Sequence, residues 1–331
     1  MKQILMTLFE HKTLGRDEAR RVLTNMARGE YNHSQIASFI SVYLMRSITI
    51  EELSGFRDAL LDLCIPVDFD GMETIDVCGT GGDGKDTFNI STLTSFVVAG
   101  AGIPVVKHGN YGVSSACGSS NLMEHMGYKF SGEVPKLKKE IEKAGLCYLH
   151  APLFNPAMKN VAPVRKELGV KTFFNMLGPM VNPAFPTCQL IGVYSLELAR
   201  LYNYLYQLTD KSYVIIHSLD GYDEVSLTGP CKVISRNMEQ IMEPGNLGFD
   251  KHAPEALASG NTVESAATIF SAVLRNEGSP AQMQVVTANA ALGIRAFHPD
   301  KPLDECIALA GESLESGKAL AVFNKLMELN R

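Results

Sequence analysis

The feature that most constrains the fold is an alternation of two kinds of segment from residue 74 onward. The runs rich in β-forming residues are Thr74–Cys78, Val105–Lys107, Leu190–Val193 and Tyr213–His217, and the helix-like stretches between them are Ser91–Ala101, Pro135–Ala144 and Leu196–Leu208. Strands that alternate with helices form βαβ units with a parallel sheet. The sequence therefore predicts the α/β class, with residues 72–331 forming a domain around a mainly parallel central sheet.

Residues 1–68 show only helical patterns. Apolar residues recur every three or four positions over 53–63, and Thr49 followed by Glu52 forms a capping box before them. We expect a small helical N-terminal domain here. Part of 157–185 is expected to join it, because residues 157–182 contain no clear strand pattern. Several apolar faces on a small helical domain favour dimerisation, so we expect a homodimer through this domain.

A glycine-rich loop follows directly after the first predicted strand. Glycines stand at positions 79, 81, 82 and 84, next to Asp83. Glycines let backbone N–H groups converge on an anion, and the N-terminus of a following helix adds a favourable dipole. A tight turn without a ligand is the simpler alternative, but so many glycines in so short a loop favour a phosphate cradle.

Two better-known phosphate motifs fit this loop incompletely. The glycine spacing matches the dinucleotide pattern GxGxxG, but that fold needs a carboxylate at the end of the next strand, where this chain has Lys107. The loop also nearly matches a P-loop, but Asp86 takes the place of the magnesium-binding Ser or Thr. A carboxylate there would repel a triphosphate, so both interpretations are disfavoured.

Two further polar segments lie where a ligand could reach them. Residues 89–92 offer an amide and two hydroxyl groups at an expected helix N-terminus, and residues 107–115 bring a lysine, a histidine, an asparagine and two serines after the second strand. Each residue alone is more typical of a turn. Together, at the carboxyl ends of predicted parallel strands, they predict additional phosphate-binding segments.

Adjacent carboxylates occur in residues 220–224, just beyond the apolar strand Tyr213–His217. In a loop, Asp223 and Glu224 can both face one pocket, which the alternation of a strand would prevent. Magnesium is commonly held by one or two carboxylates together with substrate phosphates. A solvated acidic turn would explain the pair alone. Beside two phosphate-type segments, we interpret it as a magnesium site.

Composition narrows the choice of partners. A net formal charge of −6 argues against nucleic acid or an anionic membrane as the main partner. Seven cysteines stand singly without a CxxC pair, which is typical of reduced thiols in the cytosol. No signal-peptide core is present, and no apolar run reaches the ~18 residues of a membrane span. We expect a cytoplasmic protein that binds small anionic ligands.

Together these motifs resemble the anthranilate phosphoribosyltransferase family. The matching segments, in family order, are 79–83 (GTGGD), 89–92 (NIST), 107–110 (KHGN), 174–179 (FNMLGP) with 182–183 (NP), and 223–224 (DE), together with Arg165. The likeness spans nearly the whole chain and includes the helical start. It implies a helical domain joined to a larger α/β domain, the fold of pyrimidine nucleoside phosphorylases. It also implies transfer of phosphoribose from phosphoribosyl diphosphate to the amine of anthranilate, a step toward tryptophan.

The resemblance also implies which residues form the site. The phosphoribosyl donor should contact Gly79, Gly82, Asp83, Thr87, Asn89, Ile90, Ser91, Thr92, Lys107, His108, Gly109, Asn110, Tyr111, Gly112, Val113, Ser114, Ser115 and Ser119. Magnesium, expected as two ions, should be held by Ser91, Asp223 and Glu224. Anthranilate should meet Gly79, Asn110 and Arg165. His108 is the candidate catalytic residue for proton handling, and a hydrogen bond from it to substrate is the alternative.

Two positions depart from the family pattern. Tyr111 stands where the family commonly has arginine, and Asn121 replaces a usual aspartate. The first change removes a positive charge near the expected site for the aromatic acid, which bears on how anthranilate binds and leaves the reaction class unchanged.

Three other functions use similar motifs. A pyrimidine nucleoside phosphorylase would not need the magnesium pair at 223–224. A related phosphoribosyltransferase could act on another aromatic acid, although Arg165 and Asn110 favour anthranilate. A P-loop-like switch is disfavoured by Asp86.

Overall fold

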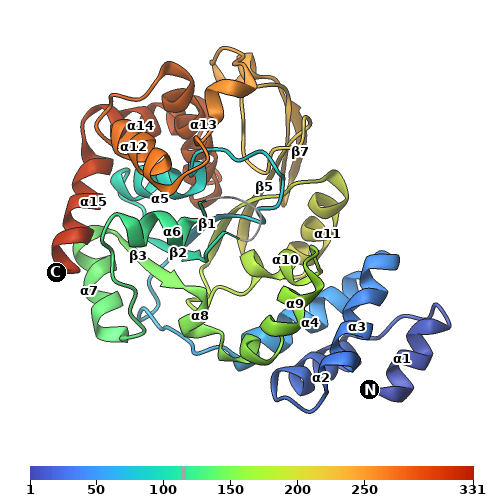
Figure 1. Cartoon of the computed structure of the whole chain (residues 1–331). Coiled ribbons are helices and arrows are strands. Elements are labelled where there is room, and N and C mark those ends of the chain that lie inside the picture. Colours follow the sequence, from blue (N-terminus) through green and yellow to red (C-terminus); the bar gives the residue numbers. More distant parts are fainter. Residues whose placement is uncertain (113–116) are drawn as a thin grey trace. The chain divides into compact units, whose positions relative to one another are not determined.

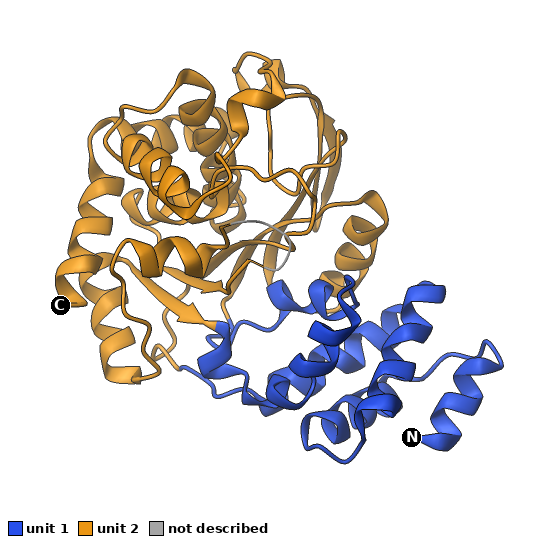
Figure 2. Ribbon diagram, in the orientation of Figure 1, with its two compact units in different colours: residues 1–67, 151–185 blue, residues 68–150, 186–331 orange. Residues whose placement is uncertain are grey.

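The computed structural model describes residues 1–112 and 117–331. The chain divides into two compact units, coloured separately in Figure 2: residues 1–67 with 151–185, and residues 68–150 with 186–331. The chain therefore leaves the first unit, returns to it after residue 150 and leaves it again after residue 185. We call these the helical unit and the α/β unit.

The helical unit is built around a cluster of aromatic rings. Its helices are α1 (Lys2–Phe9), α2 (Arg16–Ala27), α3 (His33–Met45), α4 (Ile50–Leu63), α8 (Ala151–Phe154), η1 (Pro156–Asn160), α9 (Ala162–Leu168), α10 (Phe174–Leu177) and η2 (Gly178–Met180). Thr49 caps α4 with the capping box that the sequence predicted. The ring centroid of Phe173 lies 4.6 Å from that of Phe56 and 5.1 Å from that of Tyr43. Because Phe173 belongs to the returning segment, this packing joins residues 151–185 to the N-terminal helices.

The α/β unit contains one sheet, with seven strands in the part of the chain that the structure describes. The strands are β1 (Ile75–Gly79), β2 (Val105–Gly109), β3 (Leu146–His150), β4 (Cys188–Gly192), β5 (Ser212–Ser218), β6 (Cys231–Ser235) and β7 (Met238–Met242), in the order β3-β2-β1-β4-β5-β6-β7. Neighbours from β3 through β5 are parallel, whereas β6 and β7 are antiparallel to their neighbours. The predicted class, with a helical N-terminal domain and a mainly parallel sheet, is confirmed.

Helices pack on both faces of this sheet (Figure 1). The helices of this unit are α5 (Ile90–Gly100), α6 (Ser119–His125), α7 (Val134–Ala144), α11 (Leu196–Gln207), α12 (Val263–Leu274), α13 (Pro280–Phe297), α14 (Leu303–Glu315) and α15 (Lys318–Leu329), with short η3 (Pro244–Leu247) and η4 (Pro254–Leu257). On one face, a Cβ on Gly293 of α13 would lie 3.1 Å from Val98 of α5 and 3.6 Å from Leu190 of β4. On the other face, the Tyr206 hydroxyl of α11 donates to Gln189 Oε1 of β4 at 2.5 Å. Successive strand residues point to opposite faces, so α11 and α13 lie on opposite sides.

All seven cysteines are free and buried. Within residues 1–112 and 117–331, no helix combines the length and the apolar character that crossing a membrane requires.

Candidate active site

The loops that carry the predicted site residues leave the same edge of the sheet. Strands β1, β2, β4 and β5 are parallel neighbours, so their carboxyl ends meet there. The glycine-rich loop follows β1, the segment that begins at Asn110 follows β2, and the acidic loop 219–230 follows β5. Side chains from three separate parts of the sequence can therefore converge on one ligand.

The backbone of the glycine-rich loop requires glycine. Gly81, Gly82 and Gly84 have φ angles of 61°, 79° and 74°, in the left-handed region that other residues enter only with strain. At the far end of the loop, Thr87 forms an antiparallel bridge with Ala258. The loop is thus fixed on one side by β1 and on the other by a segment that lies far away in the sequence.

Asp223 lies against the ends of β1 and β4. Its Oδ2 accepts a hydrogen bond from the backbone N–H of Gly81 at 2.7 Å. A Cβ on Gly79 would lie 2.4 Å from the same oxygen, and a Cβ on Gly192 would lie 1.7 Å from the backbone oxygen of Asp223. Gly79 and Gly192 are also direct neighbours in the sheet. This pair of glycines is what lets the acidic loop approach the glycine-rich loop so closely.

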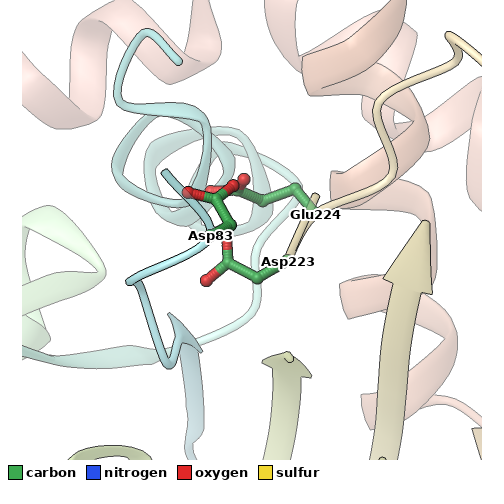
Figure 3. A group of neighbouring side chains, drawn as sticks. All are labelled: Asp83, Asp223 and Glu224. Atoms are coloured by element: carbon green, nitrogen blue, oxygen red, sulfur yellow. The ribbon is translucent and has the colours of Figure 1, made fainter. Parts of the chain in front are cut away.

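Asp83 joins Asp223 and Glu224 in a cluster of three carboxyl groups (Figure 3). One oxygen of each group lies within 4.8 Å of the corresponding oxygens of the other two. Burial raises the pKa of Asp223 to about 6, and the nearby charge of Asp83 adds to the shift. Burial, followed by the charge of Asp223, raises the pKa of Glu224 well above its usual value. Without a metal ion, Asp223 and Glu224 therefore hold protons more tightly than isolated carboxyl groups do.

Polar atoms at this edge of the sheet fit a magnesium ion and its phosphate ligand. The buried oxygens that have no hydrogen-bond partner among the described residues include Thr80 Oγ1, Asp83 Oδ2, Asn89 Oδ1 and Glu224 Oε2. Buried polar atoms are normally hydrogen-bonded, so a group of unpartnered ones marks a place where a ligand or ion supplies the partner. Oxygen is also the ligand atom that magnesium prefers.

Lys107 and His108 lie buried at the end of β2. The Lys107 Nζ donates to the backbone oxygen of Val77 at 2.7 Å, and burial lowers the pKa of its ammonium group. The backbone N–H of His108 donates to the carboxylate of Asp76 at 3.2 Å. Both contacts tie β2 to β1. The predicted donor contact of Lys107 and the proton role of His108 stay predictions.

Ser119 is held in place next to β2. The Tyr148 hydroxyl donates to Ser119 Oγ at 2.7 Å, and Ser119 Oγ lies 3.4 Å from the backbone oxygen of Asn110. A Cβ on Gly109 would lie 1.9 Å from the Tyr148 hydroxyl, so glycine leaves the space for this contact. The other residues predicted in this segment, Val113, Ser114 and Ser115, lie outside the described residues.

The two positions that depart from the family pattern take part in local packing. The ring of Tyr111 meets the ring of His150 edge-on, with 4.9 Å between their centroids. Asn121 Oδ1 accepts hydrogen bonds from the backbone N–H groups of Gly112 at 2.9 Å and Gly118 at 3.0 Å. Asparagine thus keeps the acceptor that an aspartate would provide, without its charge.

The N-terminus of α5 faces the same edge of the sheet. Asn89 precedes its first turn, and Asn89 Nδ2 donates to the backbone oxygen of Cys117 at 3.0 Å. Ile90 and Thr92 are fully buried, whereas Ser91 is partly exposed. The role of Ser91 as a magnesium ligand stays a prediction.

Arg165 belongs to α9 of the helical unit and is not part of the cluster in the α/β unit. Its guanidinium carbon lies 5.1 Å from the ring centroid of Phe174, and its Nη2 donates to Asn175 Oδ1 at 3.3 Å. Burial lowers the pKa of this guanidinium. Arg165 forms no ion pair with any residue in 1–112 or 117–331. Such an arginine is suited to bind a planar carboxylate of a ligand.

The raised pKa values predict how pH affects the metal-free protein. Asp223 has an ordinary pKa of 3.8 and a folded-state pKa of about 6, so it binds a proton more tightly when folded. Above about pH 6 the Asp223 carboxyl group is ionised in both the folded and the unfolded protein, and burying its charge then lowers the free energy of unfolding by the full amount. This destabilisation disappears as the pH falls toward 4, because the folded protein then holds the proton. Glu224 acts in the same direction.

Thermal unfolding of the wild type and of Asp223→Asn/Glu224→Gln, each without metal, measures this effect. We expect the double variant to have the higher Tm at about pH 8, and the difference in Tm between the two proteins to become smaller by about pH 5. Magnesium should stabilise the wild type at the higher pH and lose this effect through about pH 6, since protons compete for the carboxylates. A difference that does not change with pH would contradict the prediction.

The sequence did not reveal every residue that shapes the site. Asp83 was predicted to contact the donor, and the structure adds it to the carboxylate cluster. Gly192 was not singled out, although a glycine at the end of an apolar strand can signal a close backbone approach.

Two family models match the chain. The model described as the α/β domain of a glycosyl transferase family covers residues 71–320, and the helical bundle domain of the same family covers residues 2–64. Among curated relatives, an anthranilate phosphoribosyltransferase from Christiangramia forsetii is 59% identical over 331 residues, and one from Bacteroides fragilis strain YCH46 is 58% identical over 330 residues. Both alignments cover 100% of this chain and 100% of the relative.

Solved structures are similar over almost the whole length as well. The anthranilate phosphoribosyltransferase from Thermus thermophilus matches with a TM-score of 0.92 at 31% identity, covering 99% of each chain. The Saccharomyces cerevisiae enzyme in complex with PRPP and Mg matches with a TM-score of 0.90 at 26% identity, covering 98% of this chain and 96% of that one. The same yeast enzyme in complex with 4-fluoroanthranilate matches with a TM-score of 0.88 at 25% identity, with the same coverage.

Proposed function

Because the chain belongs to the anthranilate phosphoribosyltransferase family and is therefore a pentosyltransferase, we propose that it transfers phosphoribose from phosphoribosyl diphosphate to the amine of anthranilate. The products are N-(5-phosphoribosyl)anthranilate and diphosphate, and the reaction is a step of tryptophan biosynthesis. The observation that carries the proposal is the cluster of three carboxyl groups beside the glycine-rich loop.

The α/β unit supplies the groups that the donor needs. Displacement of diphosphate from C1 of the ribose has a transition state with oxocarbenium character, and negative charge grows on the leaving diphosphate. The left-handed glycines hold the backbone of the glycine-rich loop in place before the reaction, so its N–H groups that are not bonded to Asp223 stabilise this charge without reorganising. The unpartnered hydroxyl of Thr80 is a further donor in the same loop. Magnesium, when bound, supplies further neutralisation of the diphosphate charge.

We assign the magnesium ligands to Asp223, Glu224 and Ser91, with Asp83 as a further carboxylate of the same group. Two ions are proposed, because three clustered carboxyl groups carry more negative charge than one divalent ion neutralises.

For anthranilate, we assign Arg165 to its carboxylate and keep Gly79 and Asn110 as further contacts. Arginine can bind a carboxylate with two parallel hydrogen bonds, which lysine cannot do. The arylamine is neutral at physiological pH, so it needs orientation more than deprotonation. His108 is assigned to the proton that the amine loses after attack, at a position where the imidazole is buried and its backbone is fixed.

Mass spectrometry of the products distinguishes this function from its nearest rivals. Enzyme, phosphoribosyl diphosphate, magnesium and anthranilate should give phosphoribosylanthranilate and diphosphate. A nucleoside phosphorylase would instead release a free base from a pyrimidine nucleoside and phosphate, without magnesium. A related transferase would leave anthranilate unchanged and consume another aromatic acid. Either outcome would replace the proposed function.

We propose a homodimer that forms through the helical unit. Met45 is 88% exposed and Phe9 is 61% exposed, which is unusual for large apolar side chains of a small unit.

Met45→Lys should weaken association by about tenfold or more, because burying a lysine in an apolar interface is unfavourable. Sedimentation velocity over a concentration series measures the association. Leu208→Lys, at a 70% exposed position of the α/β unit, is the control and should not change it. A monomeric wild type would contradict the dimer.

We also propose that the protein works in the cytoplasm. Its seven cysteines are buried free thiols, which fits a reducing compartment.

A further inference from the structure

The loop that carries Asp223 and Glu224 is held from behind by a side chain of α13. Asn289 Oδ1 accepts a hydrogen bond from the backbone N–H of Val225 at 3.0 Å, and Asn289 Nδ2 donates to the backbone oxygen of Val225 at 2.9 Å. Nδ2 also donates to the backbone oxygen of Val285, one turn earlier in α13, at 2.8 Å. The carboxamide therefore pairs with Val225 as a neighbouring strand would, and its own helix holds it in orientation.

This arrangement lies in an apolar part of the core. Asn289 is 2% exposed, and its helix neighbours Ala288, Ala290 and Leu292 are fully buried. A buried carboxamide is unfavourable unless its hydrogen bonds are made. Here the oxygen meets one N–H group and the nitrogen meets two carbonyl groups, so only one orientation of the amide satisfies all three contacts. An aliphatic side chain would suit the surroundings of the helix but would leave the backbone of Val225 unpaired.

Three consecutive residues of the acidic loop are fixed by three different elements. Asp223 accepts from Gly81 of the glycine-rich loop at 2.7 Å. The backbone oxygen of Glu224 accepts from the hydroxyl of Ser218, at the end of β5, at 2.7 Å. Val225 pairs with Asn289 of α13. Among these three contacts, Asn289 binds both the N–H and the C=O group of one backbone residue, Val225.

We propose that Asn289 is a positioning residue for the metal-binding carboxylates. By fixing the backbone at Val225, it sets the place from which Asp223 and Glu224 present their oxygens to a divalent cation. The inference rests on the proposed function, because the cation is the one that accompanies phosphoribosyl diphosphate. Without this support, two neighbouring carboxylates that repel each other separate, and the cation is bound less tightly.

Asn289→Asp tests the proposal with almost no change in volume. The carboxylate still accepts from the N–H of Val225, but it cannot donate to Val225 or Val285, and its charge repels both carbonyl oxygens. Asn289→Ala removes all three contacts and serves as the second variant. Ser218→Ala removes the hydrogen bond from β5 to the backbone oxygen of Glu224 in the same loop. It tests whether support of this loop matters for the cation if the Asn289 variants fold poorly.

The chain contains a matched control in Asn330. Asn330 Oδ1 accepts from the backbone N–H of Lys129 at 2.6 Å, and its Nδ2 donates to the backbone oxygen of Lys129 at 3.0 Å. This is the same pairing with the backbone of one residue, also buried, at 6% exposure, and Nδ2 again makes a third contact, here to Glu140 Oε1 at 3.4 Å. It supports the segment before α7 instead of the acidic loop. Asn330→Asp therefore reports the effect of losing such a clamp on stability alone.

Binding of Mn²⁺ in the presence of phosphoribosyl diphosphate, followed by electron paramagnetic resonance, is the direct measurement, with thermal unfolding in parallel. We expect Asn289→Asp to raise the Kd for Mn²⁺ by roughly 10- to 100-fold, as is typical when a residue that supports a metal ligand is lost. The magnesium concentration for half-maximal rate should rise by a similar factor. Asn330→Asp should lower the Tm but leave the Kd for Mn²⁺ unchanged, because the two clamps share no partner.

The experiment distinguishes failure of the Asn289 inference from failure of the proposed function. If the wild type binds Mn²⁺ and the Asn289 and Ser218 variants bind it equally well, Asn289 only stabilises the fold and the inference is wrong. If the wild type itself binds no Mn²⁺ with phosphoribosyl diphosphate, the proposed function fails first.

Discussion

Asp223→Asn combined with Glu224→Gln should lower the rate of phosphoribosyl transfer by about a thousandfold, which corresponds to roughly 4 kcal/mol of lost transition-state stabilisation. The change removes two negative charges but keeps the size and shape of both side chains. Of the three carboxylates in the cluster, Asp83 alone then remains. The leaving diphosphate loses most of its neutralising charge, so the loss should appear in kcat as well as in the requirement for magnesium.

The fold of this double variant should survive. The carboxamide introduced at position 223 can still accept a hydrogen bond from the N–H of Gly81, and neutral amides avoid the burial of charge that raises the pKa of both native carboxyl groups. Without magnesium, the variant should unfold at a Tm above that of the wild type near pH 8. Wild-type turnover in this variant would remove the metal role from both residues.

Gly192→Ala should disrupt the site although residue 192 is not itself assigned to contact substrate or metal. A Cβ at this position would lie 1.7 Å from the backbone oxygen and 2.7 Å from the backbone carbon of Asp223. Because these are backbone atoms, no rotamer change relieves the clash, and the acidic loop must move. We expect a stability loss of about 1–3 kcal/mol or more. We also expect about a hundredfold loss of activity, since a displacement of about 1 Å in a site is enough for that.

Chemical denaturation and steady-state kinetics measure the two effects, and Gly132→Ala is the matched control. A Cβ at Gly132 would meet no atom within 4 Å, and the residue is not among the glycines with positive φ. Its stability and activity should equal those of the wild type. Gly192→Ala with normal activity and normal stability would show that the acidic loop is not held against β4 as described.

The parts of the fold that follow local patterns could be predicted from the sequence. Apolar runs predicted β1, β2, β4 and β5 to within a few residues, and the helix-like stretches predicted α5, α7 and α11 to within one residue at each end. The capping box at Thr49 is present as expected, because its geometry depends on residues three positions apart. Strand β3 was missed. Its five residues follow a helix that ends at Gly145 in the left-handed conformation, and so short an apolar run is ambiguous on its own.

The antiparallel end of the sheet was also missed. Strands β6 and β7 pair with each other as a hairpin, and β7 alternates between partly buried and exposed residues. Such an edge strand buries little apolar surface, so its sequence carries a weak signal.

For the site, the sequence identified segments but not their mutual contacts. The glycine-rich loop and the pair Asp223–Glu224 were recognisable because glycine and adjacent carboxylates are informative alone. The bridge of Thr87 to Ala258 and the clamp of Asn289 on Val225 join residues far apart in the sequence. No local pattern distinguishes these residues from an ordinary loop threonine or helix asparagine. Only tertiary structure shows what they hold.

The fluorescence of anthranilate, followed during incubation with the wild-type protein, phosphoribosyl diphosphate and magnesium, tests the assigned reaction most directly. Anthranilate fluorescence should fall continuously when all components are present. It should stay constant when phosphoribosyl diphosphate is omitted or magnesium is removed with a chelator, and should resume its fall when magnesium is restored in excess. Constant fluorescence in the complete mixture at high enzyme concentration would contradict the assigned reaction, and an undiminished rate in the presence of chelator would contradict the role of the carboxylate cluster.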